Sequence, residues 1–323
     1  MRRALVLGAA GFLGSHLCRR LVHDGWSVVG TVRDPAAPHV AGRLSDILGE
    51  LSLRACDVTV AGALDDLVVG ADAVFAFAGH SGAAHSLQAP TVDAASNALG
   101  QLHLLEALRH HNPDARVVFP GSRLQYGRAQ WLPVTEDHPL EPTSVYGINK
   151  MVGERYHLLY HQQFGIRTTS LRISIPYGPH QERPDHAFGV VGTFLSRAAH
   201  GEPITLYGGG TQLRDYVYVD DLVELCCRVV ADDATVGLAL NAGGARPISL
   251  REMAETLVTV VGSGSVVEAP WPADVAAVET GDYHGDLGRV RRLVGWEPAT
   301  SLEDGLRATW DALRSLVERP ISA

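Results

Sequence analysis

The sequence predicts an α/β protein with a doubly wound parallel sheet and a smaller C-terminal α/β domain. Residues 4–7, a glycine-rich turn, residues 15–24 and residues 27–32 have the patterns of strand, turn, helix and strand. The apolar runs show little polar alternation, which is typical of strands covered on both faces. After about Pro176, proline, glycine and charged residues become denser, which indicates a second domain.

The same alternation continues through the first half of the chain. We expect strands at 73–78, 116–119 and 168–173 and helices at 97–110 and 146–164.

These elements define the expected domain boundaries. A dinucleotide-binding domain covers residues 1–174 and is completed by about 215–245, and a substrate domain comprises 175–214 and 246–323. Ligands of such sheets bind at the carboxyl ends of the strands. The second domain is therefore expected to close over that edge.

Composition and charge exclude several classes of protein. Apolar residues make up 46% of the 323 residues and charged residues 20%, unlike a disordered chain. A formal net charge of -9 argues against nucleic acid or an anionic membrane as partner. No run of 18 apolar residues predicts a membrane span, and no His, Cys, Asp or Glu spacing predicts a metal site. We expect a cytoplasmic protein.

The turn after the first expected strand has the spacing GxxGxxG, formed by Gly8, Gly11 and Gly14. Glycines there permit a tight turn and close approach of the backbone to a pyrophosphate, and the N-terminus of the following helix faces the phosphates. Phe12 and Leu13, within the same turn, are further candidate cofactor contacts. Because strand, turn, helix and strand surround this pattern, it predicts a Rossmann-type dinucleotide site.

The end of the second expected strand bears on the choice of dinucleotide. NAD sites of this type usually have an acidic residue about 20 residues after the turn, and here Val32 stands there, followed by Arg33. A cation complements the 2′-phosphate of NADP, so we expect NADP(H) to be preferred, with NAD(H) as the alternative because Asp34 follows. Asp57 and the adjacent Val58 are candidate adenine contacts.

The chain has 27 basic side chains, of which only Lys150 is a lysine. Tyr146 precedes it by four residues, and residues i and i+4 share a helix face. Lowering a phenol pKa from about 10 to about 7 requires roughly 4 kcal/mol, which an adjacent ammonium and a cationic nicotinamide can supply in a dry cleft. Ser122, at the end of a central strand, is placed to hold a reacting carbonyl oxygen. These three residues are the candidate catalytic group.

Together these residues resemble the extended short-chain dehydrogenase/reductase family over nearly the whole chain. The resemblance includes the glycine turn, Ala78 and Gly79 after the fourth strand, and Asn97. The family implies that Ala78, Gly79 and Asn97 contact the cofactor, and that Tyr146 and Lys150 do so as well. It also implies a homodimer with a four-helix seam formed by residues 97–110 and 146–164.

The nucleotide-sugar branch of this family implies a substrate site. By this resemblance Arg214 and Arg292 bind the substrate diphosphate, and His80 and Ser81 lie near the sugar. Ile175 stands where the branch usually has an asparagine that contacts the diphosphate. A nucleotide sugar is nevertheless the expected substrate.

The residues after Ser122 distinguish between reactions. In the family, sugar 4,6-dehydratases carry an Asp-Glu pair at these positions, and some epimerase-reductases carry a cysteine nearby. This chain has Arg123 and Leu124 there. Neither side chain can act as a general acid or base at neutral pH. We therefore expect an NADPH-dependent ketoreductase of a nucleotide-linked 4-keto(-6-deoxy) sugar, with Tyr146 as proton donor. An NAD-retaining nucleotide-sugar 4-epimerase is the main alternative. A ketoreductase of a non-nucleotide substrate and a non-catalytic NADP(H) sensor are further alternatives.

Overall fold

The computed structural model describes residues 1–181, 189–272, 276 and 279–317. Its centre is a seven-stranded parallel sheet, which agrees with the predicted fold class. From one edge to the other the strands are β11 (Ala239–Ala242), β6 (Arg167–Ile173), β5 (Arg116–Ser122), β4 (Ala73–Ala76), β1 (Arg3–Leu7), β2 (Ser27–Val32) and β3 (Leu51–Ala55).

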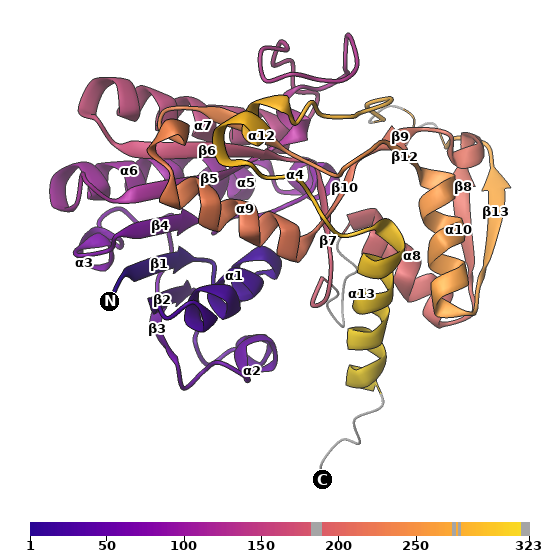
Figure 1. Cartoon of the computed structure of the whole chain (residues 1–323), viewed down its shortest axis with the longest axis horizontal. Coiled ribbons are helices and arrows are strands. Elements are labelled where there is room, and N and C mark those ends of the chain that lie inside the picture. The colour runs from indigo at the N-terminus through magenta and orange to yellow at the C-terminus, as the bar shows by residue number, and fades with distance from the viewer. Residues whose placement is uncertain (182–188, 273–275, 277–278, 318–323) are drawn as a thin grey trace.

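Helices cover both faces of the sheet, which explains why the strands are apolar on both sides (Figure 1). α1 (Phe12–His23) and α9 (Val219–Ala231) pack together on one face. α3 (Asp65–Val68), α6 (Gly100–His111) and α7 (Val145–Phe164) cover the other. The short helix α2 (Pro38–Leu44) follows β2.

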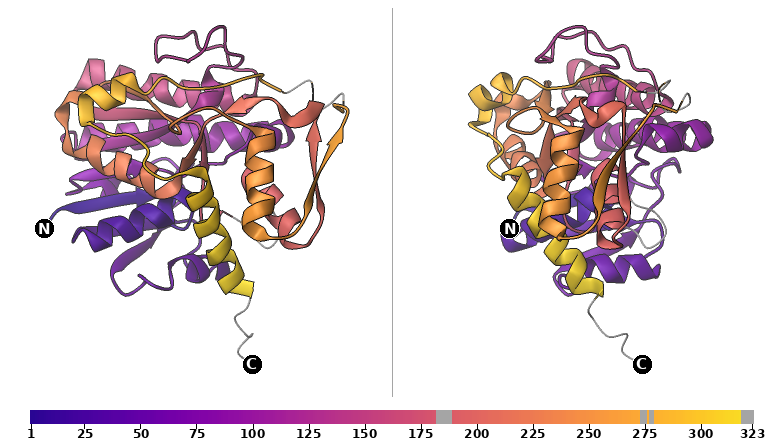
Figure 2. Two further views of the ribbon diagram at one scale, coloured as in Figure 1. Left: turned by 45° about the vertical axis from the view of Figure 1, so that its right-hand side comes forward. Right: turned by 90° about the vertical axis from the view of Figure 1, so that its right-hand side faces the viewer.

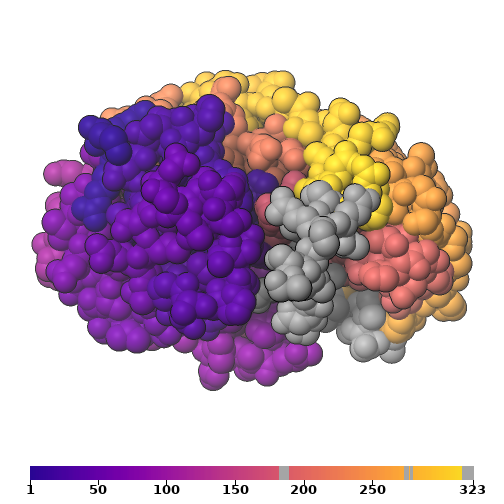
Figure 3. All heavy atoms as spheres, turned by 90° about the horizontal axis from the view of Figure 1, so that it is seen from below, coloured from indigo at the N-terminus to yellow at the C-terminus, as the bar shows by residue number. Residues whose placement is uncertain are grey.

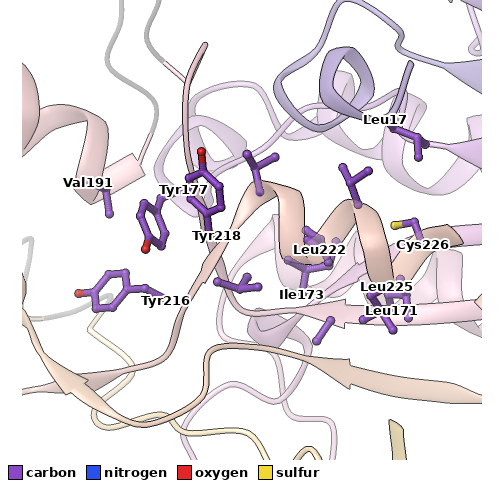
Figure 4. Packing of buried hydrophobic residues seen from close by; sticks show 14 of the residues in the cluster. Leu17, Leu171, Ile173, Tyr177, Val191, Tyr216, Tyr218, Leu222, Leu225 and Cys226 are labelled. Atoms are coloured by element: carbon purple, nitrogen blue, oxygen red, sulfur yellow. The ribbon is translucent and has the colours of Figure 1, made fainter. Parts of the chain in front are cut away.

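Part of the largest core cluster lies between β6 and α9, where Leu171 and Ile173 of the strand face Leu222 and Leu225 of the helix (Figure 4). α9 buries one face because its apolar residues recur every three or four positions. This packing holds β6 and the edge strand β11 in place.

The strand order determines where ligands bind. The chain forms β1, β2 and β3 toward one edge and then returns to place β4, β5 and β6 on the other side of β1. The carboxyl ends of β1 and β4 are therefore a topological switch point, where open α/β sheets bind ligands. Three short segments after β4, namely α4 (Ala83–Gln88), α5 (Pro90–Ala94) and the π-helical turn η1 (Ala95–Leu99), lie between β4 and α6.

The remaining chain forms a smaller lobe beside the sheet (Figure 2). β8 (Pro203–Tyr207) pairs in parallel with β13 (Ser265–Ala269), and α10 (Leu250–Val261) packs on both α8 (Gly189–Ala199) and α13 (Leu302–Val317). The two lobes are distinct masses when the molecule is viewed from below (Figure 3).

Short strand pairs connect the lobes. They are β7 (Ile175–Tyr177) with β10 (Tyr216–Tyr218), and β9 (Leu213–Arg214) with β12 (Ile248–Ser249). Short helical turns and one helix complete the structure, namely η2 (Arg123–Gln125), η3 (Gly208–Gly210), η4 (Asp233–Thr235) and α12 (Gly288–Val294).

Two expected elements differ from the structure. β5 continues to Ser122 instead of ending at Phe119, because parallel pairing with β6 keeps Pro120 opposite Leu171 in the sheet. The helix expected from residue 97 begins as α6 at Gly100, and Asn97 lies in the preceding π-helical turn. π-helical turns are frequent at functional sites.

Candidate functional site

The glycine turn between β1 and α1 is shaped for close approach by a ligand. Gly8 has φ +78°, and a Cβ atom there would lie 2.9 Å from the backbone nitrogen of Ala78. A Cβ atom on Gly14 would lie 2.2 Å from the carbonyl oxygen of Gly8, so α1 packs against the turn only with glycine there. Gly11 caps α1 without a side-chain hydrogen bond, and Phe12 and Leu13 form its first turn. The first N–H groups of α1 are therefore available to a phosphate.

The predicted adenosine contacts gather at the carboxyl ends of β2 and β3. Arg33 is exposed directly after β2 and lines a pocket of about 310 Å³ with Val32, Asp34 and His39. Asp57 accepts hydrogen bonds from the hydroxyl and backbone N–H of Thr59.

These bonds lower the pKa of Asp57, and the positive charge of Arg33 lowers it further. The buried Val58 follows Asp57, and its carbonyl oxygen lies 2.9 Å from Nδ1 of His103. The structure therefore brings Arg33 and Asp57 together, with Arg33 free to face a ligand.

The segment after β4 meets Asn97 at the other end of this cleft. Asn97 is fully buried, and its Nδ2 donates to the carbonyl oxygen of His80 and to Asp93. Its Oδ1 is buried without a hydrogen-bond partner among the described residues, and a Cβ atom on Gly79 would lie only 2.4 Å from it. A buried amide oxygen without a partner needs an external donor. Together with the glycine turn, this oxygen fits a bound dinucleotide.

The other residues predicted in this segment lie around Asn97. Ala78 and His80 are half-buried and Ser81 is exposed. Burial lowers the pKa of His80, and the charge of Arg33 adds to this shift. Both effects favour the neutral imidazole of His80.

The three predicted catalytic residues come from two elements. Ser122 ends β5 and its hydroxyl accepts a hydrogen bond from the N–H of Leu124, while Tyr146 and Lys150 lie one turn apart near the start of α7. Ser144 caps α7 by accepting from the N–H of Gly147. Interaction with Ser122 lowers the pKa of the Tyr146 phenol, so the serine lies near the tyrosine.

The electrostatics of Tyr146 differ from the sequence-based expectation. Burial raises the pKa of Tyr146 to about 12, although the interaction with Ser122 opposes this shift. Lys150 is buried as well, its Nζ lies 5.8 Å from the centre of the tyrosine ring, and burial lowers its own pKa to about 8. The residues of the chain alone therefore keep the pKa of the phenol above its usual value, because desolvation exceeds the opposing effect of Ser122.

A carboxylate that the sequence argument missed connects these groups. Asp93 on α5 is 1% exposed, and its two oxygens accept hydrogen bonds from Asn97 and from Asn149 of α7. Its charge raises the pKa values of both Lys150 and Tyr146. The signal in the sequence is an acid four residues before Asn97, on the same helical face.

The predicted substrate arginines lie in different settings. Arg214 on β9 is buried, forms an ion pair with Glu279 and donates to the carbonyl oxygens of Leu213 and Gly281. Arg292 is exposed on α12 and has no ion-pair partner in the described part of the chain. The contacts of the structure do not join these two arginines to each other.

Two further findings restrict the chemistry of the molecule. No helix in the described ranges is both long and apolar enough to span a bilayer. The same ranges contain no group of three or more His, Cys, Asp or Glu residues arranged to hold a metal ion.

A parallel sheet with a glycine turn at its switch point and a Ser-Tyr-Lys group beside it defines an NAD(P)-dependent enzyme of the extended short-chain dehydrogenase/reductase type. The family model described as "NAD dependent epimerase/dehydratase family" matches residues 4–243. The chain belongs to this family, and within it to the nucleotide-sugar epimerase branch.

Curated relatives are similar over their full length. The chain is 32% identical to the uncharacterized UDP-glucose epimerase YtcB of Bacillus subtilis, covering 98% of this chain and 99% of the relative. It is 30% identical to the UDP-glucose 4-epimerase of Mycolicibacterium smegmatis, covering 97% and 99%.

Solved structures agree. The UDP-glucose 4-epimerase of Thermotoga maritima with UDP-glucose matches with a TM-score of 0.88 at 27% identity, covering 98% of this chain and all of that one. The UDP-glucuronic acid 4-epimerase of Bacillus cereus, in complex with UDP-glucuronic acid and NAD, matches with a TM-score of 0.85 at 27% identity, covering 97% and 99%. These relatives favour the epimerase alternative of the sequence analysis over the ketoreductase.

Proposed function

We propose that the protein is an NAD-retaining UDP-sugar 4-epimerase. The observation that carries the proposal is the placement of Tyr146 and Lys150 one turn apart on α7, with the Lys150 Nζ 5.8 Å from the tyrosine ring and Ser122 at the end of β5 close enough to lower the pKa of the phenol. Arg123 and Leu124, the next residues after Ser122, supply no carboxylate or thiol for further proton transfers. The group is therefore sufficient to oxidise and reduce one carbinol, which is all that 4-epimerisation needs.

Each of the three residues has a separate task in this proposal. The Ser122 hydroxyl orients the oxygen on C4 of the sugar. Tyr146, as phenolate, takes the proton of the C4 hydroxyl when the ketone forms and returns it when the opposite epimer is made. The Lys150 ammonium stabilises the phenolate that is present before the first of these proton transfers and again after the second. NAD, when bound, supplies a cationic ring that accepts a hydride from C4 and later gives it back.

The cofactor is held by the elements that form the cleft. The turn with Gly8, Gly11 and Gly14 and the N-terminus of α1 receive the pyrophosphate. Asp57 and Val58 lie on the adenosine side of the cofactor. The Oδ1 of Asn97 accepts a hydrogen bond from the other end of the dinucleotide. We favour NAD over the NADP expected from Arg33, because the family description names NAD and the B. cereus structure contains it.

The substrate lies in this proposal between the sheet and the smaller lobe. That lobe, residues 175–214 and 246–323, is the substrate domain, with Arg214 and Arg292 as ligands of the diphosphate and His80 and Ser81 near the sugar. The UDP-sugar titles of the similar epimerases support this substrate class.

We also propose that the protein is a homodimer that pairs α6 and α7 of two copies. Apolar side chains stand exposed on and beside these helices, including Leu99 (45%), Ile148 (44%), Leu159 (46%) and Phe164 (43%). Burying such a patch is favourable, and a symmetric four-helix seam is one way to do so. Light scattering tests this part, and a monomeric mass contradicts it.

The central experiment separates the epimerase from the NADPH-dependent ketoreductase. The purified protein is unfolded and any released dinucleotide identified by mass spectrometry. The intact protein is incubated with UDP-glucose and UDP-glucuronic acid, and the products are followed by NMR. We expect NAD to be released and a C4 epimer to form without added cofactor and without net absorbance change at the wavelength of reduced nicotinamide.

The opposite result has a defined meaning. Exchangeable NADPH, consumed in proportion to a 4-keto nucleotide sugar with no epimer formed, overturns the epimerase in favour of the ketoreductase.

A further inference from the structure

One half-buried cation beside the proposed site has no acidic partner among the described residues. Arg123 follows Ser122 directly as the first residue of η2, and its Nη1 donates to Thr280 Oγ1 at 3.4 Å. Its guanidinium carbon lies 5.4 Å from the centre of the Tyr283 ring. Among the described residues this is its only hydrogen bond, and no carboxylate there lies within ion-pair distance.

The buried arginines of the described chain are paired. Arg172 bonds Glu154 at 2.7 Å, Arg116 bonds Asp233 at 2.6 Å, and Arg214 bonds Glu279. A cation that is removed from water is costly unless it is paired. Arg123 differs from these three, because it is half-buried and has no acid, and it directly follows Ser122.

The nearby carboxyl group does not fill this role. Asp215 accepts hydrogen bonds from Ser174 and, at 3.0 Å, from the N–H of Gly285, but not from Arg123. Burial raises the pKa of Asp215 to about 7, so it is only partly charged at neutral pH. Burial and the neighbouring charge of Arg214 lower the pKa of Arg123. The balance of charge around Arg123 thus favours an added anion.

A second polar group in the same region also lacks a partner. Tyr216 is 5% exposed, and its hydroxyl is buried without a hydrogen bond to any described residue. The hydroxyl lies at the end of the ring away from the core residues Ile173 and Leu222 (Figure 4). Burial raises the pKa of this phenol, and the positive charges of Arg214 and Arg123 oppose that shift. A phenol O–H and free guanidinium N–H groups are donors that match an oxyanion.

We propose that Arg123 binds an oxyanion of the substrate and thereby sets the substrate specificity of the enzyme. The inference rests on the proposed function, because it takes a nucleotide sugar as the ligand. The chemistry fits a carboxylate on the sugar, as in a nucleotide-linked uronic acid, or a phosphate oxygen of the diphosphate. The position of Arg123 directly after Ser122 favours the sugar carboxylate, because Ser122 holds the reacting carbon nearby.

The test compares three ligands that share one nucleotide. Calorimetry measures the affinities of the NAD-loaded wild type, Arg123→Leu and Arg123→Gln for UDP-glucuronic acid, UDP-glucose and UDP. We expect Arg123→Leu to weaken the binding of UDP-glucuronic acid about 10- to 100-fold. A loss of this size corresponds to one charge-assisted hydrogen-bonded pair. The exposed Arg128→Leu serves as the matched control and leaves all three affinities unchanged.

The three ligands separate the sources of the anion. A loss confined to UDP-glucuronic acid identifies the sugar carboxylate, and an equal loss for all three identifies the diphosphate. Wild-type affinities in both Arg123 variants overturn the inference. If the wild type binds none of the ligands, the proposed function itself fails. Circular dichroism of each variant verifies that it is folded.

Discussion

Two buried polar networks of the sheet half are satisfied internally, whereas two buried polar atoms near the proposed site are not. Beneath the sheet end, Glu154 accepts hydrogen bonds from Arg172 and Ser170, and His157 lies within hydrogen-bond distance of Thr168 and Gln101. Near the proposed site, by contrast, Asn97 Oδ1 and Tyr216 Oη are buried without a hydrogen-bond partner among the described residues.

The difference separates structural from functional residues. A satisfied network contributes rigidity, while an unsatisfied buried group costs free energy that a ligand can recover. Changes in the first region should therefore affect stability, and changes in the second should affect binding or turnover.

The largest expected effect is on turnover, and it comes from Tyr146→Phe. Loss of the hydroxyl removes the proposed proton carrier, so we expect epimerisation to slow about 100- to 10,000-fold. The unfolding midpoint in urea should change little, because the ring still fills its place. A variant that keeps wild-type turnover would remove Tyr146 from the mechanism.

The next effect compares two arginines directly. Arg172→Leu leaves Glu154 buried without its cation, and we expect a loss of about 3–5 kcal/mol in the free energy of unfolding. Arg123→Leu removes an unpaired cation and should leave this free energy unchanged or higher. Urea unfolding of both variants tests the comparison. Equal destabilisation would mean that Arg123 is a structural residue.

A pH profile tests the role of Asp93. Its negative charge raises the pKa of Lys150, which burial holds at about 8. Asp93→Asn keeps the shape but removes the charge, so the pKa of Lys150 should fall and the alkaline loss of kcat should begin at lower pH. Asp46→Asn, on the surface, is the control. An unchanged alkaline limb would separate Asp93 from the catalytic electrostatics.

The smallest effect is expected from Arg33→Ala. If NAD is the resident cofactor, the exposed Arg33 contributes little to cofactor binding. The amount of NAD retained through purification should then stay the same. Titration of the emptied protein with NADH and NADPH provides the measurement. A selective loss of NADPH affinity would support the NADP preference that the sequence predicts.

Much of the fold could be predicted because its signals are local. The prediction of a strand at residues 27–32 is confirmed, because a short apolar run that follows Gly25 favours a buried strand over a helix. β5 was predicted too short because Pro120 and Gly121 usually end strands, and only the pairing with β6 overrides this tendency. The start of α6 was misplaced because the π-helical turn depends on contacts of Asn97 with Asp93 and with the segment after β4.

The candidate site divides in the same way. The glycine spacing and the Tyr146–Lys150 pair are visible in the sequence because turn and helix geometry are set by neighbouring residues. Asp93 and Arg123 were not recognised, because burial and the presence or absence of a partner depend on residues far away in the chain.

The sequence alone thus determined the parallel α/β architecture, the dinucleotide turn and the tyrosine–lysine pair, each of which follows from spacing within a few residues. Only the tertiary structure decided which charges are paired. It joined Glu154 to Arg172, brought Asp93 close enough to Lys150 to raise its pKa, and left Arg123 beside Ser122 without an acid in the described chain. Pairing depends on contacts between distant segments and on exclusion of water, which no local pattern encodes.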